Sequence, residues 1–193
     1  MQDFLASVNL TDVVIVLFLF GCFILGWVQG TIRRLVGIGS MVFSFLLAAV
    51  LSVPLGEFLA RHWTQFPPEY AAMIGFLTVF VAAVIAFSLV IQGTYKKAPL
   101  FAQYPVIDEI LGDVLGVVQG FLLLMFLVII LDQFFLLTNF PVDDDELPLL
   151  REFWTAIDAS GTGELLHTTV IPAFVTLTSF LLPDSIEQLY GVA

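Results

Sequence analysis

Residues 105–132, with the sequence PVIDEILGDVLGVVQGFLLLMFLVIILD, are the main basis for predicting the fold of this chain. The stretch joins acidic residues at its start to an apolar run long enough to cross a bilayer, which takes about 20 residues. It also carries Gly112, Gly116 and Gly120, spaced four residues apart. Glycines at this spacing share one helix face, which lets another helix backbone approach closely. The stretch predicts a transmembrane helix near 110–131 with a small-residue packing face.

The composition of the whole chain extends this prediction to several spans. Of the 193 residues, 60% are hydrophobic and 12% are charged, and the mean hydropathy is +1.04. A soluble domain has roughly 45–50% apolar residues, so a soluble core could not bury this many. Three further apolar runs, near 10–28, 35–55 and 71–92, have spanning length. We expect an all-α integral membrane protein whose core is a four-transmembrane-helix bundle with small-residue packing faces.

Charge and residue usage exclude several classes of function. The formal net charge is −11 with only six lysines and arginines in total, so a nucleic-acid partner is not expected. Cys22 is the only cysteine and lies in an apolar run, where it serves as small packing material. The sequence shows no catalytic Ser/His/Asp or Cys/His set, no metal-ligand cluster and no phosphate-cradling glycine loop. We therefore expect no enzyme, no catalytic or metal site and no cofactor.

The basic residues predict the orientation of the spans. Arg33 and Arg34 lie in the first loop, Arg61 in the second, and Lys96 and Lys97 in the third. Since cytoplasmic loops carry the excess of lysine and arginine, the first and third loops are expected in the cytoplasm. With four spans, the N-terminus and the C-terminal tail are then extracytoplasmic.

Acidic residues near the ends of the expected spans leave alternatives open. Asp12 is either a cap or first-turn acid that complements the positive end of the helix dipole, or a buried polar residue used by the bundle. Asp108 is expected to complement the N-terminus of the fourth helix. Asp113 lies at least one turn further in. It is either interfacial or faces inward and pairs with Arg33 or Arg34.

Small residues predict how the first spans pack. Gly26 and Gly30 are four residues apart, and the second span that follows is rich in glycine, serine and alanine. We expect spans one and two to form a tight hairpin, followed by a loop at 54–70 with one or two helical turns. The hexapeptide LGWVQG at 25–30 returns as LGVVQG at 115–120, either as a duplicated, transporter-like repeat or by chance.

The chain changes character after the fourth expected span. Residues 1–132 are expected to form the membrane domain, and residues 133–193 an acidic extracytoplasmic tail. The acidic run at 143–146 lacks the ligand spacing, central glycine and closing glutamate of a calcium-binding EF-hand loop. We interpret it as a solvated loop.

Residues 165–182 of the tail predict an amphipathic helix that is interrupted near Pro172. It is expected on the outer membrane face or packed on the bundle. A fifth span is the competing interpretation, in which Asp113 and His167 share an interior; otherwise His167 has no evident partner. The apolar residues at helical spacing are Leu166, Val170, Ala173, Phe174, Leu177, Phe180 and Leu181.

Several of these features together resemble the colicin V production protein family, the CvpA-like proteins. They are an aspartate before the first span, a glycine and basic residues at its end, and an aspartate that opens a glycine ladder in the fourth. The residues concerned are Asp12, Gly30, Arg33, Arg34, Asp108, Gly112, Gly116 and Gly120. The chain departs from the family pattern at Gln29, Glu109 and Gln119, where basic residues are frequent, so no role of those charges is carried over.

The resemblance implies a small, four-span protein of the bacterial inner membrane, in a family named for colicin V production. We expect a scaffold or accessory factor in toxin production or secretion or in envelope homeostasis. Its expected partners are the lipid bilayer and either a second copy of the chain or a membrane or periplasmic protein. The alternative is a small transporter or channel with a polar path near Asp113 and Gln119. Expected helix-packing residues are Gly26, Gly30, Gly112, Gly116 and Gly120, and expected depth and charge-pairing residues are Asp12, Arg33, Arg34, Asp108 and Asp113.

Overall fold

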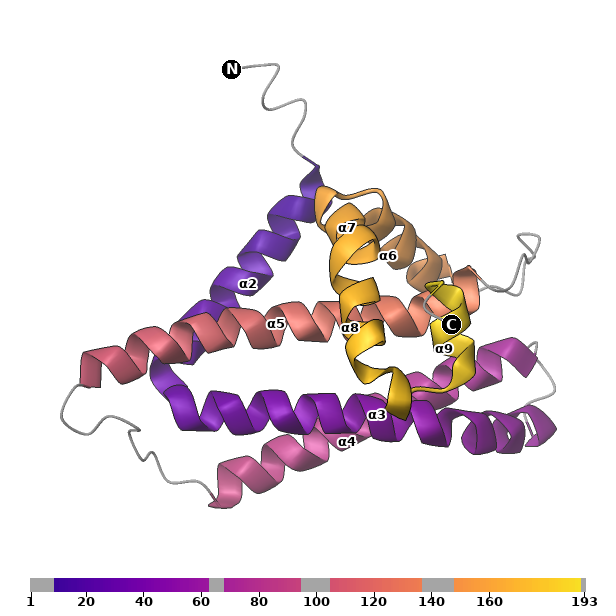
Figure 1. The fold of residues 1–193 in the computed structure, drawn as a ribbon, viewed down its shortest axis with the longest axis horizontal. Helices are drawn as coiled ribbons and strands as arrows, with labels where there is room; N and C mark the ends of the chain where they lie inside the picture. The colour runs from indigo at the N-terminus through magenta and orange to yellow at the C-terminus, as the bar shows by residue number, and fades with distance from the viewer. Residues whose placement is uncertain (1–8, 63–67, 95–104, 137–147, 192–193) are drawn as a thin grey trace.

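The computed structural model of the chain is helical in every element that it describes (Figure 1). It describes residues 9–62, 68–94, 105–136 and 148–191. The expected all-α class is therefore confirmed for this part of the chain. The acidic run at 143–146 and the pair Lys96 and Lys97 lie outside the described residues.

Four long helices precede a group of short ones (Figure 1). The long helices are α2 (Leu10–Gln29), α3 (Thr31–His62), α4 (Pro68–Thr94) and α5 (Pro105–Phe135). The short elements are α6 (Pro148–Asp158), α7 (Gly161–Leu165), the π-helical turn η1 (Leu166–Val170), α8 (Ile171–Thr178), the 3₁₀ turn η2 (Ser179–Leu181) and α9 (Asp184–Leu189).

Local sequence explains both ends of α2. Its N-cap is Asn9, whose side chain accepts a hydrogen bond from the Thr11 amide at 3.0 Å. It ends at Gly30, which adopts a φ of 76° and donates its amide to the Gly26 carbonyl at 3.0 Å. Because only glycine adopts this backbone conformation without strain, the chain can leave α2 here and begin α3 at once.

The expected hairpin of the first two spans is wrong. After Gly30 the two helices diverge, and α2 packs along α5 whereas α3 packs along α4 (Figure 1). The physical reason is that α5 offers a glycine face that accepts the α2 backbone, while small residues of α3 are buried elsewhere. The buried small residues of α3 are Ser44, Ala48, Ala49 and Gly56.

The helix α3 is also longer than expected, because it continues through Pro54 to His62. The predicted loop at 54–70 is therefore wrong in its first part. A proline inside a helix costs one backbone hydrogen bond, which packing must offset. Close packing against α4 compensates for the lost hydrogen bond. The two helices approach so closely here that a Cβ on Gly75 would lie only 3.3 Å from the amide nitrogen of the buried Gly56.

Aromatic side chains join α3, α4, α5 and α8 in the core. The rings of Phe45 and Phe126 stack with centroids 4.3 Å apart, and Phe80 meets Phe126 edge-on at 5.8 Å. Phe174 of α8 lies 5.3 Å from Phe126 and 6.0 Å from Phe45. Such pairs each add about 0.5–1.5 kcal/mol beyond area burial, so the tail helix belongs to the same core as the long helices.

Within the described residues, five helices are long and apolar enough to cross a membrane. They support a multi-pass membrane protein, but the expected count of four spans is not confirmed. The fifth candidate, Gly161–Leu181, differs in direction from α3 and α5 (Figure 1). Figure 1 shows α8 running across α5 toward α3, whereas α3 and α5 themselves follow the long axis of the molecule.

The amphipathic character expected for the tail helix is not confirmed either. Its buried apolar side chains are Leu166, Ile171 and Val175, whereas Leu177 and Phe180 are 76% and 80% exposed. Apolar residues therefore occupy both the buried and the outward side. The π-helical turn at Leu166–Val170 adds one residue to a helical turn just before Pro172, which rotates the following side chains relative to those before it.

Candidate functional site

The glycines of α2 and α5 meet in an antiparallel contact that we call the glycine seam. A Cβ on Gly112 would lie 2.7 Å from the Gly26 carbonyl oxygen, and one on Gly120 would lie 2.7 Å from the Cys22 sulfur. A Cβ on Gly116 would collide with the Cys22 carbonyl oxygen. The two backbones are thus in direct contact, as close helix packing in lipid requires. The members of the seam are Gly26, Gly30, Gly112, Gly116 and Gly120.

The seam is the main attachment of α2. Ile15 and Gly26 are the buried residues of this helix, and most of its apolar side chains point outward. The α3 helix does not share the seam, since Gly37 faces the side chain of Gln119 instead. The two hexapeptides at 25–30 and 115–120 lie on opposite sides of the seam, where their glycines Gly26 and Gly116 touch.

Asp108 lies buried at the end of the seam where α2 turns into α3. Its carbonyl accepts a hydrogen bond from the Thr31 hydroxyl at 2.9 Å. One carboxylate oxygen would lie 2.8 Å from a Cβ on Gly30. Asp108 therefore contacts the turn after α2 as well as lying in the first turn of its own helix α5.

Asp113 and Arg34 are both buried but do not pair with each other. Asp113 packs its backbone against Gly26, and its Oδ1 has no hydrogen-bond partner. Arg34 donates from Nη1 to Gln119 Oε1 at 2.7 Å, while its Nε and Nη2 have no partner. Among the described residues, neither Arg33 nor Arg34 forms an ion pair with Asp113.

Arg34 also lines a polar cavity of about 150 Å³ at the meeting point of α2, α3, α4 and α5. We call it the Arg34 cavity. Its walls are formed by Gln29, Arg33, Arg34, Gly37, Ser88, Ile91 and Gln119. Gln119, named in the transporter alternative, is part of this wall, whereas Asp113 is not.

Asp12 caps a helix other than its own. Its carboxylate accepts hydrogen bonds from the amides of Gly161 and Thr162 at 3.1 and 3.0 Å, and from the Thr162 hydroxyl at 2.7 Å. Ser160 is the N-cap residue of α7, and its hydroxyl accepts a hydrogen bond from the Gly163 amide at 3.0 Å. The carboxylate thus satisfies free amides at the positive end of α7 and ties the start of α2 to the tail.

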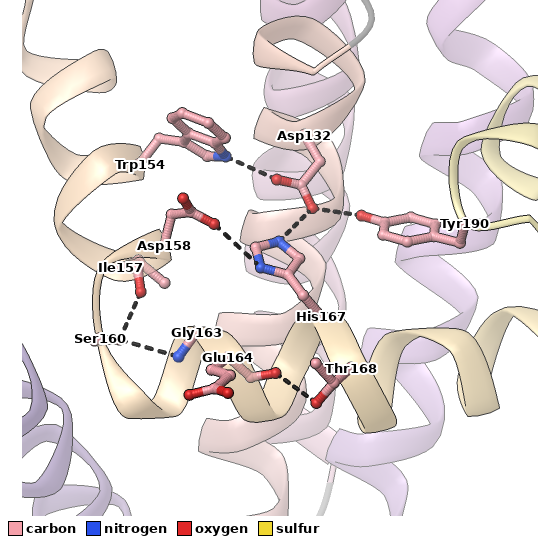
Figure 2. A network of polar contacts seen from close by, with 10 residues as sticks. All are labelled: Asp132, Trp154, Ile157, Asp158, Ser160, Gly163, Glu164, His167, Thr168 and Tyr190. Atoms are coloured by element: carbon pink, nitrogen blue, oxygen red, sulfur yellow. Dashed lines mark hydrogen bonds and ion pairs between the residues drawn. The ribbon is translucent and has the colours of Figure 1, made fainter.

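Asp132, at the end of α5, forms the centre of a second polar cluster (Figure 2). Its side chain is fully buried. The Trp154 indole donates to Oδ1 at 2.7 Å, and the Tyr190 hydroxyl donates to Oδ2 at 2.5 Å. His167 Nε2 lies 2.8 Å from the same Oδ2. We call Asp132, Trp154, Asp158, His167 and Tyr190 the Asp132 network.

His167 has a carboxylate on each side of its ring. Besides the Asp132 contact, its Nδ1 lies 3.4 Å from an oxygen of Asp158 (Figure 2). The imidazolium form suits this arrangement, because it donates from both nitrogens. A positive ring between two carboxylates compensates part of the cost of burying Asp132.

Burial, reinforced by the Asp132 carboxylate, raises the pKa of the Tyr190 hydroxyl above its ordinary value. The phenol therefore keeps its proton and remains a donor to Asp132 throughout the physiological range. This single carboxylate joins α5 to α6, to η1 and to the residue that directly follows α9.

Sequence reasoning missed the Asp132 network, although one signal was present. An aspartate at the C-terminal end of a long apolar helix faces the negative end of the helix dipole, which is unfavourable unless donors compensate it. That position predicts nearby donors without saying which residues supply them. In the described part of the chain, no group of three or more His, Cys, Asp or Glu side chains is placed to hold a metal ion.

Comparison with known proteins adds one match. A family model described as colicin V production protein matches residues 11–156, which is most of the chain. It covers α2 to α5 and most of α6, and it ends before Asp158, His167 and Tyr190. The match confirms the resemblance drawn from the residues. No curated protein and no solved structure matches the chain.

Proposed function

The chain belongs to the colicin V production protein family, and on that premise we propose that it is a scaffold or accessory factor in the production or secretion of a colicin V-like toxin, or in envelope homeostasis. It works as a multi-pass protein of the bacterial inner membrane. Its role is non-enzymatic and needs no cofactor. Its partner is a second copy of the chain or a membrane or periplasmic protein.

One observation carries this proposal: the polar side chains of the apolar helices join parts of the protein to one another. Asp12 fastens the start of α2 to α7, and Asp132 fastens the end of α5 to three parts of the tail. Polar groups at such positions are expensive, so contacts of this kind support a body of fixed shape. A scaffold requires a fixed shape, whereas a transporter needs polar groups that face a path.

The orientation of the scaffold follows from the basic residues and the direction of the tail. We place Arg33 and Arg34 at the cytoplasmic side, with α2 to α5 as four spans. The tail contacts the second half of α5, at Phe126 and Asp132, which is then its extracytoplasmic half. The helix at Gly161–Leu181 lies across that half, in keeping with its direction in Figure 1.

The proposed role is tested in a strain that produces and exports a colicin V-like toxin. The chromosomal gene is deleted and replaced by the natural chain, by Gly116→Leu, or by the control Gly21→Leu, whose position meets no atom within 4 Å. We expect deletion and Gly116→Leu to reduce the amount of secreted toxin or to raise the sensitivity of the cells to SDS. The Gly21→Leu chain should return toxin secretion and SDS resistance to the level of the natural chain. Unchanged toxin export and SDS resistance after deletion would refute the proposal.

The alternative function as a small transporter has one observation in its favour, which is the polar cavity lined by Gln119. On this alternative, Asp113→Asn and Gln119→Leu proteins fold but lose a solute flux that the natural protein shows in liposomes. The absence of flux from the natural protein, or intact flux in both variants, excludes the alternative.

A further inference from the structure

The tail between His167 and Tyr190 begins and ends at one point of the molecule. His167 Nε2 lies 2.8 Å from Asp132 Oδ2, and the Tyr190 hydroxyl donates to the same oxygen at 2.5 Å. A segment that crosses the hydrocarbon core has its two ends about 30 Å apart. The helix at Gly161–Leu181 has the length of a span, but the chain after it returns to the end of α5. Its path is therefore that of a loop and not of a crossing.

The middle of this loop lies deep beside the long helices. The ring centroid of Phe174 in α8 is 6.0 Å from that of Phe45, which in turn is 6.2 Å from that of Phe80. Phe45 lies midway along the apolar run at 35–55, about 15 Å from either end at 1.5 Å per residue. Phe80 lies close to the middle of the run at 71–92. Since the hydrocarbon core is about 30 Å thick, α8 packs near its centre rather than at its surface.

The outward face of the loop is apolar at this depth. Leu177 is 76% exposed, Phe180 is 80% exposed and Leu181 is 48% exposed. Residues 168–183 contain no charged side chain, and acidic residues return only with α9, which leads back toward Asp132. A helix that is apolar on its buried and its outward side is typical of a helix surrounded by protein and lipid.

The polar groups of the loop also suit hydrocarbon, where each must find a partner within the protein. The exposed Thr176 hydroxyl donates to the Pro172 carbonyl of its own helix at 2.7 Å. In the turn that follows α8, Leu182 is buried and its amide donates to the Ser179 carbonyl at 3.1 Å. Irregular backbone at membrane depth is tolerated where protein covers it, and this turn meets that condition.

From these observations we propose that residues 168–189 form a re-entrant hairpin. It enters the hydrocarbon core beside α3 and α5, contacts lipid acyl chains with the outward face of α8, and returns through α9 to the surface at Asp132 (Figure 1). Acyl chains are the partner because this face continues the lipid-facing surface of the long helices. Phe43, two residues from Phe45 on α3, is 54% exposed at the same level. The inference goes beyond the scaffold role and uses only the membrane location of the long helices.

The depth of the hairpin is tested on purified full-length protein in liposomes. In a Cys22→Ala background, single cysteines replace Leu177 or Phe180 and carry a nitroxide spin label. Both side chains are exposed, so the substitutions leave the core intact. Electron paramagnetic resonance measures collisions with oxygen, which concentrates in hydrocarbon, and with a water-soluble nickel chelate. The reference for lipid is Val50→Cys, 60% exposed within the span of α3, and the reference for water is Glu57→Cys at the exposed end of the same helix.

We expect the ratio of oxygen to nickel collisions at Leu177→Cys and Phe180→Cys to match that of Val50→Cys and to exceed that of Glu57→Cys. Each variant should keep the melting temperature of the Cys22→Ala protein, which shows that the fold is retained. Ratios equal to that of Glu57→Cys at both tail positions would place the hairpin in water and overturn the proposal.

The return of the hairpin is tested at two exposed positions that flank it, Glu152 and Gln188. Single cysteines there, again in the Cys22→Ala background, are treated in intact cells with a membrane-impermeant maleimide. We expect Glu152→Cys and Gln188→Cys to react alike, because both ends lie on one side of the membrane. Reaction of only one of them before lysis would mean that the segment crosses, which overturns the proposal. Neither experiment measures toxin secretion, so failure of the hairpin and failure of the scaffold role are distinguishable.

Discussion

At the scale of the residue, the Asp132 side chain shows how a buried charge is tolerated in this protein. It sits at the C-terminal end of α5, where the helix dipole opposes a negative charge. Donors from Trp154, His167 and Tyr190 compensate for this position. Each hydrogen bond to a charged group contributes about 1.5–3 kcal/mol, so loss of one donor should be measurable.

The first prediction concerns Trp154→Phe, which removes the indole donor and keeps an aromatic ring. We expect the free energy of unfolding, measured by SDS titration, to fall by about 1–3 kcal/mol, because one oxygen of Asp132 loses its partner. The matched control is Trp27→Phe, on a side chain that is 48% exposed. Equal effects of the two substitutions would contradict a specific role for the Trp154 hydrogen bond.

The second prediction concerns Asp12→Ala. Its carboxylate caps the free amides of Gly161 and Thr162, and loss of a cap costs about 0.5–2 kcal/mol. Hydrogen exchange followed by mass spectrometry should therefore show faster exchange at the start of α7. Amides in the middle of α4, which Asp12 does not contact, serve as the internal control. Unchanged exchange at residues 161–162 would show that the cap does not stabilise α7.

At the scale of the element, α2 depends on backbone contact rather than on side-chain interdigitation. In lipid no hydrophobic gain draws helices together, so attraction depends on how closely the backbones approach. The glycine seam allows that approach along the last three turns of α2. Elsewhere α2 presents large apolar side chains outward, as a lipid-facing helix does.

The third prediction follows from this contact. Gly116→Leu should push α2 away from α5 and lower the stability in SDS by about 1–3 kcal/mol or more, the usual cost of overpacking. Gly21→Leu adds the same side chain to open space on α2 and should change stability by less than about 0.5 kcal/mol. If both variants keep the natural melting temperature and oligomeric state, the seam does not determine packing.

At the scale of the whole molecule, the tail and the long helices form one core. Leu166, Ile171 and Val175 of the tail are fully buried with residues of α3, α4 and α5. The family match ends at residue 156, so most of these tail contacts lie beyond the matched region. The tail is thus integrated into the bundle by contacts of its own.

The fourth prediction is the location of the tail. Reporter fusions placed after Pro148 and after Ala193 should both be active outside the cytoplasm if α2 to α5 are the four spans. An outside signal after Pro148 with a cytoplasmic signal after Ala193 would mean that Gly161–Leu181 crosses the membrane. The bundle would then have five spans, and the orientation proposed for the tail would be wrong.

The features that depend on neighbours along the chain follow from the amino-acid sequence alone. Apolar run length places the four long helices, and four-residue spacing puts Gly112, Gly116 and Gly120 on one face. The same local patterns carry the family resemblance. These features were predictable because helix period and bilayer thickness act on each segment separately.

Which segments contact one another depends on how the whole bundle folds. In the folded protein α2 packs against α5 rather than against α3. Asp12 forms hydrogen bonds with Thr162, 150 residues away in the sequence, and His167 contacts Asp132 rather than Asp113. Each of these choices depends on the shapes of distant surfaces and on which buried polar group finds a donor. No periodicity in the sequence encodes that information, because the partners come together only when the whole bundle packs.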